Sequence, residues 1–235
     1  MRKIRCEACP TRGKSIACDL DASSLDDFAA VGTSAVYRPR QVVFSEGNPA
    51  AGLYLVCHGQ VKLFCSDRFG RQHVIDLLQA GDVFGAFAPG GAHVHATSAE
   101  TVVESQVSFL STERLAGYLH RNSQVAQRLM TVLSEQLGRA RRQVRDLAFK
   151  AADSRLASWI VDLARRDGGL VAGNRVAVPF SRRDIAETIG VSTETAIRLL
   201  RRFDAERAIA LEPHALVIVD PERLLRLAHH DDAEV

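Results

Sequence analysis

Long hydrophobic runs are missing from this sequence. Its apolar stretches are short and interrupted, and the opening residues lead into cysteines rather than into the apolar core of a signal peptide. We therefore expect no membrane-spanning segment and a cytoplasmic location. An excess of charge of one sign is also missing, because 30 Lys and Arg side chains face 28 Asp and Glu side chains and leave a formal charge of +2. Any binding to nucleic acid must therefore depend on local charge.

Signatures of common enzyme classes are absent as well. The sequence contains no G-x-S-x-G nucleophile motif, no glycine-rich phosphate loop ending in Lys and Ser or Thr, and no H-E-x-x-H helix. The chain is thus predicted not to be an enzyme. Cysteine is scarce, with five residues, but Cys6, Cys9 and Cys18 all stand within the first 18 positions. Without a secretion signal, such crowding indicates metal or redox chemistry more than a disulfide framework.

The remaining sequence indicates four consecutive segments, which we place at residues 1–22, 23–120, 121–150 and 151–235. The first is the cysteine-bearing arm. The second opens with a short helix at Ser23 to Val31 and continues to about Leu110 with short β-type runs and glycine turns, which is typical of a β-barrel or jelly roll. The third is one long helix. The fourth, with a strand pair around Leu170 to Val178, two short helices from Ser181 to about Ala208 and a closing hairpin, has the order of a winged helix-turn-helix. The predicted fold class is α+β.

The long helix carries an apolar stripe whose residues recur at steps of three and four. A near-heptad stripe sustained over about seven turns suits paired helices, so we predict a homodimer. The alternative is that this helix packs only on its own β domain. The predicted dimer seam consists of Leu129, Val132, Leu133, Gln136, Leu137, Ala140 and Val144.

The two short helices have the residue types that a helix-turn-helix needs. Ser181 and Asp184 form the two ends of a capping box at the start of the first helix. Gly190 provides the backbone freedom for the turn, and Ser192 can cap the second helix. The inner faces of the two helices are predicted to consist of Ile185, Ala186, Ile189, Ala196, Leu199 and Leu200.

The outer face of the second helix is predicted to read DNA in the major groove. Its exposed residues are Thr193, Glu194, Ile197 and Arg198. Glu194 can accept a hydrogen bond from a cytosine amino group and Arg198 can donate two to a guanine. The alternative is an i, i+4 ion pair between them, worth about 0.2 to 0.5 kcal/mol. Phosphate contacts are expected from Arg182, Arg183, Arg201 and Arg202.

Over essentially its whole length the chain resembles the family of the cyclic-AMP receptor protein and the fumarate and nitrate reductase regulator. The residues that carry the resemblance are LYLVCHGQVK at 53–62, AGDVFG at 80–85, SRRDIA at 181–186 and TETAIR at 193–198. The resemblance implies a double-stranded β-helix as sensor, a dimerisation helix and a winged helix-turn-helix. It also implies RNA polymerase as a partner and an inverted-repeat DNA site with half-sites about 34 Å apart. Members with Glu and Arg at 194 and 198 read a TGA-like core, and Ile197 could contact a thymine methyl group.

The resemblance also bears on the effector. Members that bind cyclic nucleotides hold the phosphate with Glu, Arg and Ser, where this sequence aligns Ala86, His95 and Ala96. Without the arginine nothing neutralises a buried phosphate, so cyclic-nucleotide binding is not expected. The arm looks like the cluster-binding arm of the oxygen-sensing branch. The resemblance therefore implies a four-iron four-sulfur cluster with Cys6, Cys9 and Cys18 as ligands.

Three cysteines are one ligand short of such a cluster. The oxygen-sensing branch draws its fourth ligand from the late β-roll, where this sequence aligns Ser108, so Cys57, Cys65 or a carboxylate stays open as a substitute. Other effectors also stay open, namely zinc at the same ligands, thiol oxidation without metal, a small organic effector, and haem on His73, His93, His95, Cys57 or Cys65. A cupin-type metalloenzyme using His93 and His95 would leave the recognition helix unexplained.

Overall fold

The computed structural model describes residues 15, 16, 20, 22–87, 93–178 and 181–229. The chain divides into two compact units, Met1–Arg139 and Ala140–Val235. Their boundary falls inside one long helix, α3 (Ser123–Phe149). Within the described residues, no helix is both long enough and apolar enough to cross a membrane.

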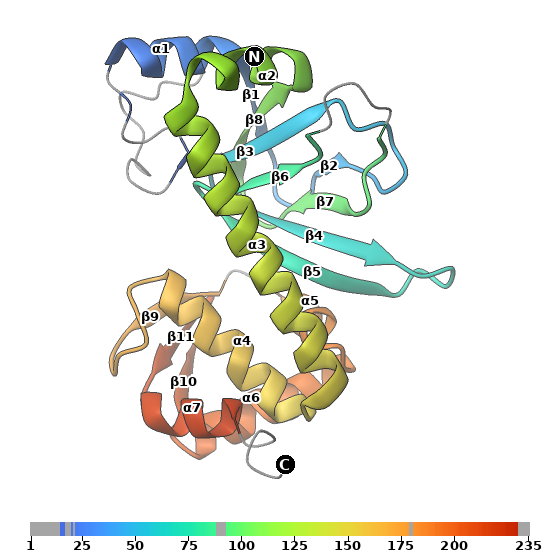
Figure 1. Ribbon diagram of the computed structural model, residues 1–235. Coiled ribbons are helices and arrows are strands. Elements are labelled where there is room, and N and C mark those ends of the chain that lie inside the picture. Colours follow the sequence, from blue (N-terminus) through green and yellow to red (C-terminus); the bar gives the residue numbers. More distant parts are fainter. Residues whose placement is uncertain (1–14, 17–19, 21, 88–92, 179–180, 230–235) are drawn as a thin grey trace. The chain divides into compact units, whose positions relative to one another are not determined.

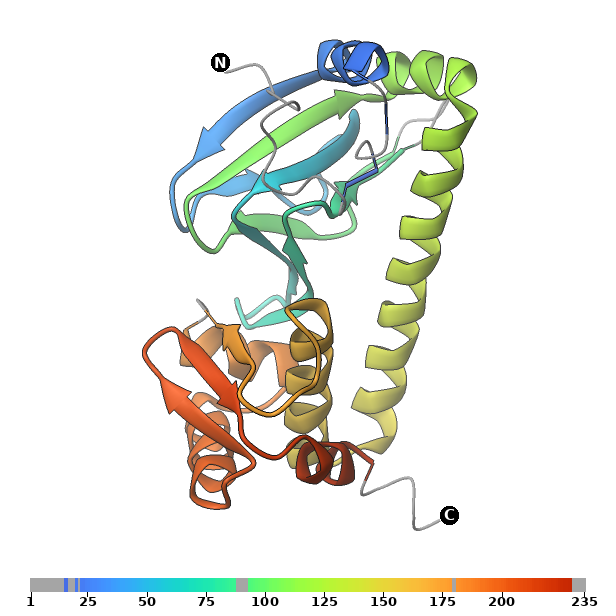
Figure 2. The ribbon, with the colours of Figure 1, turned by 90° about the vertical axis from the view of Figure 1, so that its left-hand side faces the viewer.

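The first unit is a roll of two four-stranded antiparallel sheets, as the glycine-separated β runs predicted (Figure 1). One sheet has the strand order β1-β8-β3-β6 and the other has the order β2-β7-β4-β5. The helices α1 and α2 lie side by side at one end of the roll (Figures 1 and 2). The elements are α1 (Ala22–Val31), β1 (Gly32–Tyr37), β2 (Val42–Phe44), β3 (Gly52–His58), β4 (Gln60–Ser66), β5 (Gln72–Gln79), β6 (Val83–Gly85), β7 (Ser98–Thr101), β8 (Ser105–Ser111) and α2 (Thr112–Arg121).

This unit has two apolar clusters, one on each face of the β1-β8-β3-β6 sheet. Strand alternation explains the division, because successive side chains of β3 point to opposite faces. Val56 contributes to the cluster inside the roll, together with residues such as Phe44 and Phe84. Leu53 and Leu55 contribute to the second cluster, which also contains buried residues of α1, α2 and the start of α3. We call this second group the helix-side cluster. Its buried members are Ile16, Leu25, Phe28, Leu53, Leu55, Val83, Leu110, Leu115, Tyr118, Val125 and Leu129.

The second unit contains the predicted helix-turn-helix and its β-hairpin. Its elements are α4 (Ala152–Arg166), β9 (Arg175–Ala177), α5 (Arg182–Ile189), α6 (Thr193–Ala205), β10 (Ile209–Glu212), β11 (Ala215–Ile218) and α7 (Pro221–Ala228). The hairpin strands and β9 form a sheet in the order β10-β11-β9. Buried apolar side chains from α4, α5 and α6, including Ile160, Ile185 and Phe203, form the core of this unit.

Two expectations for the second unit were wrong in detail. The segment Leu170 to Val178 contains one strand, β9, rather than a strand pair. The residues before β9 form a loop, because the side-chain Nδ2 of Asn174 donates to the backbone carbonyls of Asp167 and Gly169 at 2.7 and 2.6 Å. The hairpin also does not close the unit, since α7 follows it, with Asp220 as its N-cap.

Candidate nucleic-acid interface

Local interactions hold α5, the turn and α6 in the predicted helix-turn-helix. The predicted capping box is confirmed, because Ser181 Oγ accepts from the Asp184 N–H at 3.1 Å and Asp184 Oδ2 accepts from the Ser181 N–H at 2.9 Å. Gly190 adopts the left-handed conformation at φ 67°, where a side chain would be strained. Ser192 caps α6 by accepting from the Thr195 N–H at 3.2 Å. The six predicted inner-face residues of the motif are all buried.

The outer face of α6 presents the four predicted base-reading residues. Glu194 and Arg198 are exposed, and Thr193 and Ile197 are partly exposed. Hydrogen bonds from the backbone N–H of Glu194 and from the Ser192 hydroxyl lower the pKa of the Glu194 carboxyl group, so it is a preformed acceptor. Among the described residues, no ion pair joins Glu194 to Arg198. The alternative interpretation, an ion pair between these two side chains within α6, therefore does not describe the structure.

The four arginines predicted to bind phosphates fall into two groups. Arg183 is paired with Glu187 at 2.7 Å, and Arg202 is paired with Asp153 of α4 at 2.8 Å. Burial raises the pKa of Asp153, but the hydrogen bond and the charge of Arg202, together with hydrogen bonds from backbone N–H groups, outweigh burial, so the pKa of Asp153 is lowered overall. Arg182 and Arg201 are exposed and have no ion pair with a described residue. These two are better placed to bind phosphate, since Arg183 and Arg202 would have to leave a carboxylate.

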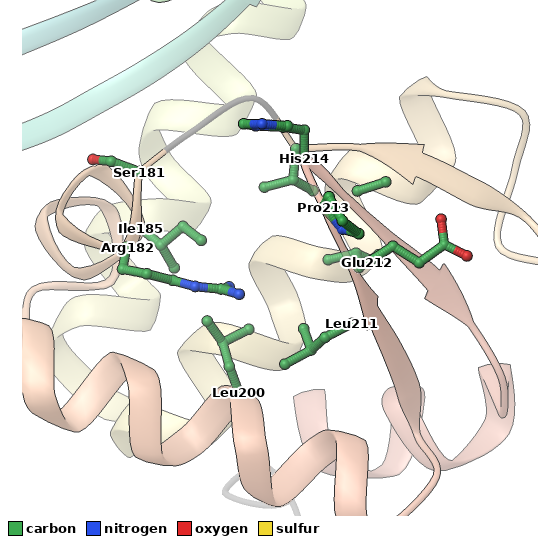
Figure 3. A pocket seen from close by; sticks show the side chains of 11 residues that line it. Ser181, Arg182, Ile185, Leu200, Leu211, Glu212, Pro213 and His214 are labelled. Carbon is green, nitrogen blue, oxygen red and sulfur yellow. The ribbon is translucent and has the colours of Figure 1, made fainter.

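A cavity of about 260 Å³ separates the start of α5 and α6 from the β10–β11 hairpin. Ile185 and Leu200 provide part of its apolar wall, and Arg182 extends into it from the first turn of α5 (Figure 3). Glu212 also lines the cavity, and its carboxylate pairs with Arg175 of β9 at 2.7 Å. The guanidinium of Arg182 therefore lies between the helix-turn-helix and the hairpin, outside the reading face of α6.

The predicted dimer seam combines residues of two neighbouring stripes of α3, which the structure distinguishes by their contacts. Leu129 is buried and Val132 packs against the helix-side cluster. Gln136 Nε2 donates to the carbonyl of Val83 on β6 at 2.6 Å. These three residues therefore contact their own unit. The stripes lie only about 100° apart around the helix and share the three-and-four spacing, so periodicity cannot separate them.

The other stripe of α3 is exposed, and we call it the exposed α3 row. It keeps four predicted seam residues and adds Met130 and Leu147, which fit the same heptad spacing. Leu137 is 51% exposed and Val144 is 68% exposed, which is unusual for large apolar side chains on one helix face. The row consists of Met130, Leu133, Leu137, Ala140, Val144 and Leu147.

The interior of the roll is filled by aromatic side chains around His95. The imidazole is 4% exposed and stacks on the Phe44 ring with 3.6 Å between the ring centroids. Tyr54 and Phe84 stack beside Phe44 and extend the cluster. Burial lowers the pKa of His95, because the charged imidazolium loses its hydration. The residue aligned with a phosphate-binding arginine is therefore a packed, neutral side chain.

This burial predicts a pH dependence of stability. The unfolded chain can protonate His95 near pH 6.5, whereas the folded protein holds its pKa lower. The free energy of unfolding should therefore fall as the pH drops below about 6.5 and level off below the folded pKa. Denaturant titrations between about pH 7.5 and 5.5 should show a weaker fall for His95→Gln than for the wild type. The exposed His93→Gln is the matched control, and equal slopes in all three proteins would contradict the assignment.

The three arm cysteines, Cys6, Cys9 and Cys18, lie outside the described residues. Cys57 on β3 and Cys65 on β4 are partly buried and neither forms a disulfide. No group of three or more His, Cys, Asp or Glu side chains in the described part of the chain could hold a metal ion. A metal site on the roll would therefore need ligands from elsewhere in the chain.

Comparison with known proteins identifies two domain families. The cyclic nucleotide-binding domain family matches residues 35–122, and the Crp-like helix-turn-helix domain family matches residues 154–227. A CRP-like cAMP-activated global transcriptional regulator of Mycobacterium tuberculosis is 29% identical over 187 residues, 79% of this chain and 84% of the relative. The fumarate and nitrate reduction regulatory protein of Escherichia coli is 26% identical, with 97% of this chain and 91% of the relative aligned. The structure of FixK2 from Bradyrhizobium japonicum matches with a TM-score of 0.74 at 27% identity, over 84% of this chain and 97% of that chain.

Proposed function

Because this chain is a DNA-binding transcription regulator of the CRP/FNR type, we propose that it acts as a twofold homodimer on an inverted-repeat DNA site. The observation that carries the proposal is the reading face of α6, where Glu194 and Arg198 are exposed. Both helices of the motif are capped, and their inner faces are buried. The exposed α3 row supports the dimer. Its large apolar side chains repeat at heptad spacing, as the seam of a two-stranded coiled coil does.

In this proposal each α6 reads one half-site in the major groove. Glu194 accepts from a cytosine amino group, Arg198 donates two hydrogen bonds to a guanine, and Ile197 contacts a thymine methyl group. Arg182 and Arg201 bind phosphates and set the position of α6 along the duplex. Twofold symmetry then requires two half-sites about 34 Å apart. In this proposal RNA polymerase is a further partner of the DNA-bound dimer.

We propose further that the regulator responds to oxygen or redox state through Cys6, Cys9 and Cys18. Thiolates are soft ligands that suit iron, and an iron–sulfur cluster bound there would supply a group whose stability depends on oxygen and redox potential. Regulation by a cyclic nucleotide is not part of the proposal. The neutral His95 stacked on Phe44 cannot offset a phosphate charge as an arginine would.

The test is the DNA affinity of the full chain purified without oxygen, measured before and after exposure to air. On an inverted-repeat duplex, we expect air to change the affinity about tenfold or more, which is about 1.4 kcal/mol or more. Cyclic AMP should leave the affinity unchanged. Cys9→Ala should bind DNA equally in both states. Equal affinity of the wild type before and after air would contradict the redox proposal, and binding that requires cyclic AMP would contradict the assignment of the effector.

A further inference from the structure

Two residues, Lys150 and Ala151, separate the end of α3 from the start of α4. We call this pair the α3–α4 junction. Ala151 occupies the N-cap position of α4 in an extended conformation, and its methyl side chain has no oxygen for a capping hydrogen bond. A capping side chain therefore does not fix the direction in which α4 leaves α3. That direction depends on contacts from other residues of the second unit.

Arg155 of α4 donates to the junction and to the helix-turn-helix at the same time. Its Nη1 donates to the Lys150 carbonyl at 2.7 Å, and its Nε donates to the Ile189 carbonyl at 2.8 Å. Lys150 follows the last residue of α3, and Ile189 is the last residue of α5, directly before the Gly190 turn. The last carbonyls of a helix lack intrahelical partners and carry partial negative charge, so a guanidinium binds them favourably. One side chain thus connects the ends of two helices.

Two further contacts join α4 to the helices on either side of it. The buried ammonium of Lys150 pairs with Asp146 of α3 at 3.2 Å and donates to Ser158 Oγ of α4 at 2.8 Å. Arg202, in the last turn of α6, pairs with Asp153 in the first turn of α4 at 2.8 Å. The first two turns of α4 are therefore bonded both to the end of α3 and to the recognition helix.

These contacts connect the two surfaces on which the proposed DNA binding depends. Val144 and Leu147 of the exposed α3 row lie within two turns of the junction. Ser192, which caps α6, stands three residues after Ile189. In a twofold dimer, the angle between α3 and α6 determines where the two reading faces lie along the duplex. A guanidinium that fixes this angle therefore influences which half-site spacing the dimer accepts.

We propose that Arg155 is a positioning residue for DNA reading, which holds α6 at a fixed angle to the last turns of α3 and so sets the accepted spacing between half-sites. The inference rests on the dimeric DNA binding proposed above. Arginine suits this role because its planar guanidinium presents N–H groups in a fixed fork, whereas a lysine ammonium is a point charge on a flexible stem. Without Arg155 each α6 still reads a half-site, but the two α6 helices of the dimer no longer keep one separation.

The experiment measures the affinity of the full chain for inverted-repeat duplexes whose spacer is lengthened or shortened by single base pairs. One base pair moves a half-site by about 3.4 Å and rotates it by about 35°. The wild type should bind about tenfold or more weakly at one base pair from its best spacing, because both half-sites are no longer bound at once. Arg155→Met keeps an apolar stem but removes both donors, so this ratio should fall to about threefold or less. A duplex with one half-site should be bound equally by both proteins.

Two more variants separate the fork of Arg155 from its charge. Arg165→Met removes an exposed guanidinium from the same helix and should keep the spacing dependence of the wild type. Arg155→Lys keeps the charge but not the fixed fork, so it should also reduce the spacing dependence. Circular dichroism of each variant verifies that the helices are retained.

The outcomes separate this inference from the function on which it rests. A wild type that binds one half-site as tightly as every inverted repeat would overturn both the dimeric binding and the role of Arg155. A wild type with a preferred spacing, matched in full by Arg155→Met or Arg155→Lys, would overturn only the role of Arg155. An equal reduction in Arg165→Met would do the same. Loss of binding to the single half-site in both Arg155 variants would show that Arg155 maintains the fold of the motif instead, and would also overturn it.

Discussion

Leu133→Glu is expected to convert the proposed dimer into a monomer and to lower DNA affinity by about 100-fold or more, because two linked half-site contacts become single ones. Leu133 is 40% exposed in the single chain, so the substitution removes little packing within the protomer. In the paired α3 helices it would place two carboxylates at an apolar seam, where burying unpaired charge is costly. Sedimentation gives the oligomeric state, and titration of an inverted-repeat duplex gives the affinity.

Two further substitutions on α3 show whether the effect belongs to the exposed α3 row. Thr131→Glu adds the same charge to an exposed position outside both stripes, so this variant should remain dimeric. Val132→Glu inserts the charge where α3 packs against the helix-side cluster, so it should reduce the free energy of unfolding instead. If Leu133→Glu sediments as a dimer with unchanged DNA affinity, the exposed α3 row is not the dimer interface.

Arg198→Ala is expected to weaken binding to the cognate site by about 1 to 3 kcal/mol and to relax discrimination at one guanine of each half-site. The guanidinium is exposed on α6 and has no ion pair with Glu194, so removing it costs the fold little. Affinities for duplexes substituted at single positions, measured at constant salt, identify the base pair whose identity ceases to matter.

Arg182→Ala is the matched control for this loss of specificity. Its side chain lies by the hairpin rather than on the reading face of α6 (Figure 3). Removing a phosphate contact should weaken binding to all sequences alike. It should also reduce the slope of log K against the logarithm of the salt concentration by about one. An unchanged base preference in Arg198→Ala, or a base-specific loss in Arg182→Ala, would reverse the two assigned roles.

Much of the second unit could be predicted from the sequence because its determinants are local. The capping box of Ser181 and Asp184 joins residues three apart, and the left-handed turn depends on Gly190 alone. The strands of the roll were predictable for a similar reason, since glycine turns and short β-type runs are features of neighbouring residues. The prediction of a strand pair before Val178 was wrong because the Asn174 side chain donates to carbonyls five and seven residues earlier. No pattern in the sequence indicates those hydrogen bonds.

The sequence by itself determined the two domain types, the helix-turn-helix and the face of α6 that carries Glu194 and Arg198, because caps, turns and periodicity act within a few residues. Only the tertiary structure decided which stripe of α3 stays exposed, that Arg202 pairs with Asp153 from 49 residues away, and that the buried hydroxyl of Ser108 has no hydrogen-bond partner among the described residues. These features depend on which distant segment packs against each residue. Spacing along a chain shows which residues share a face, but the partner of that face is set by contacts between segments far apart in sequence.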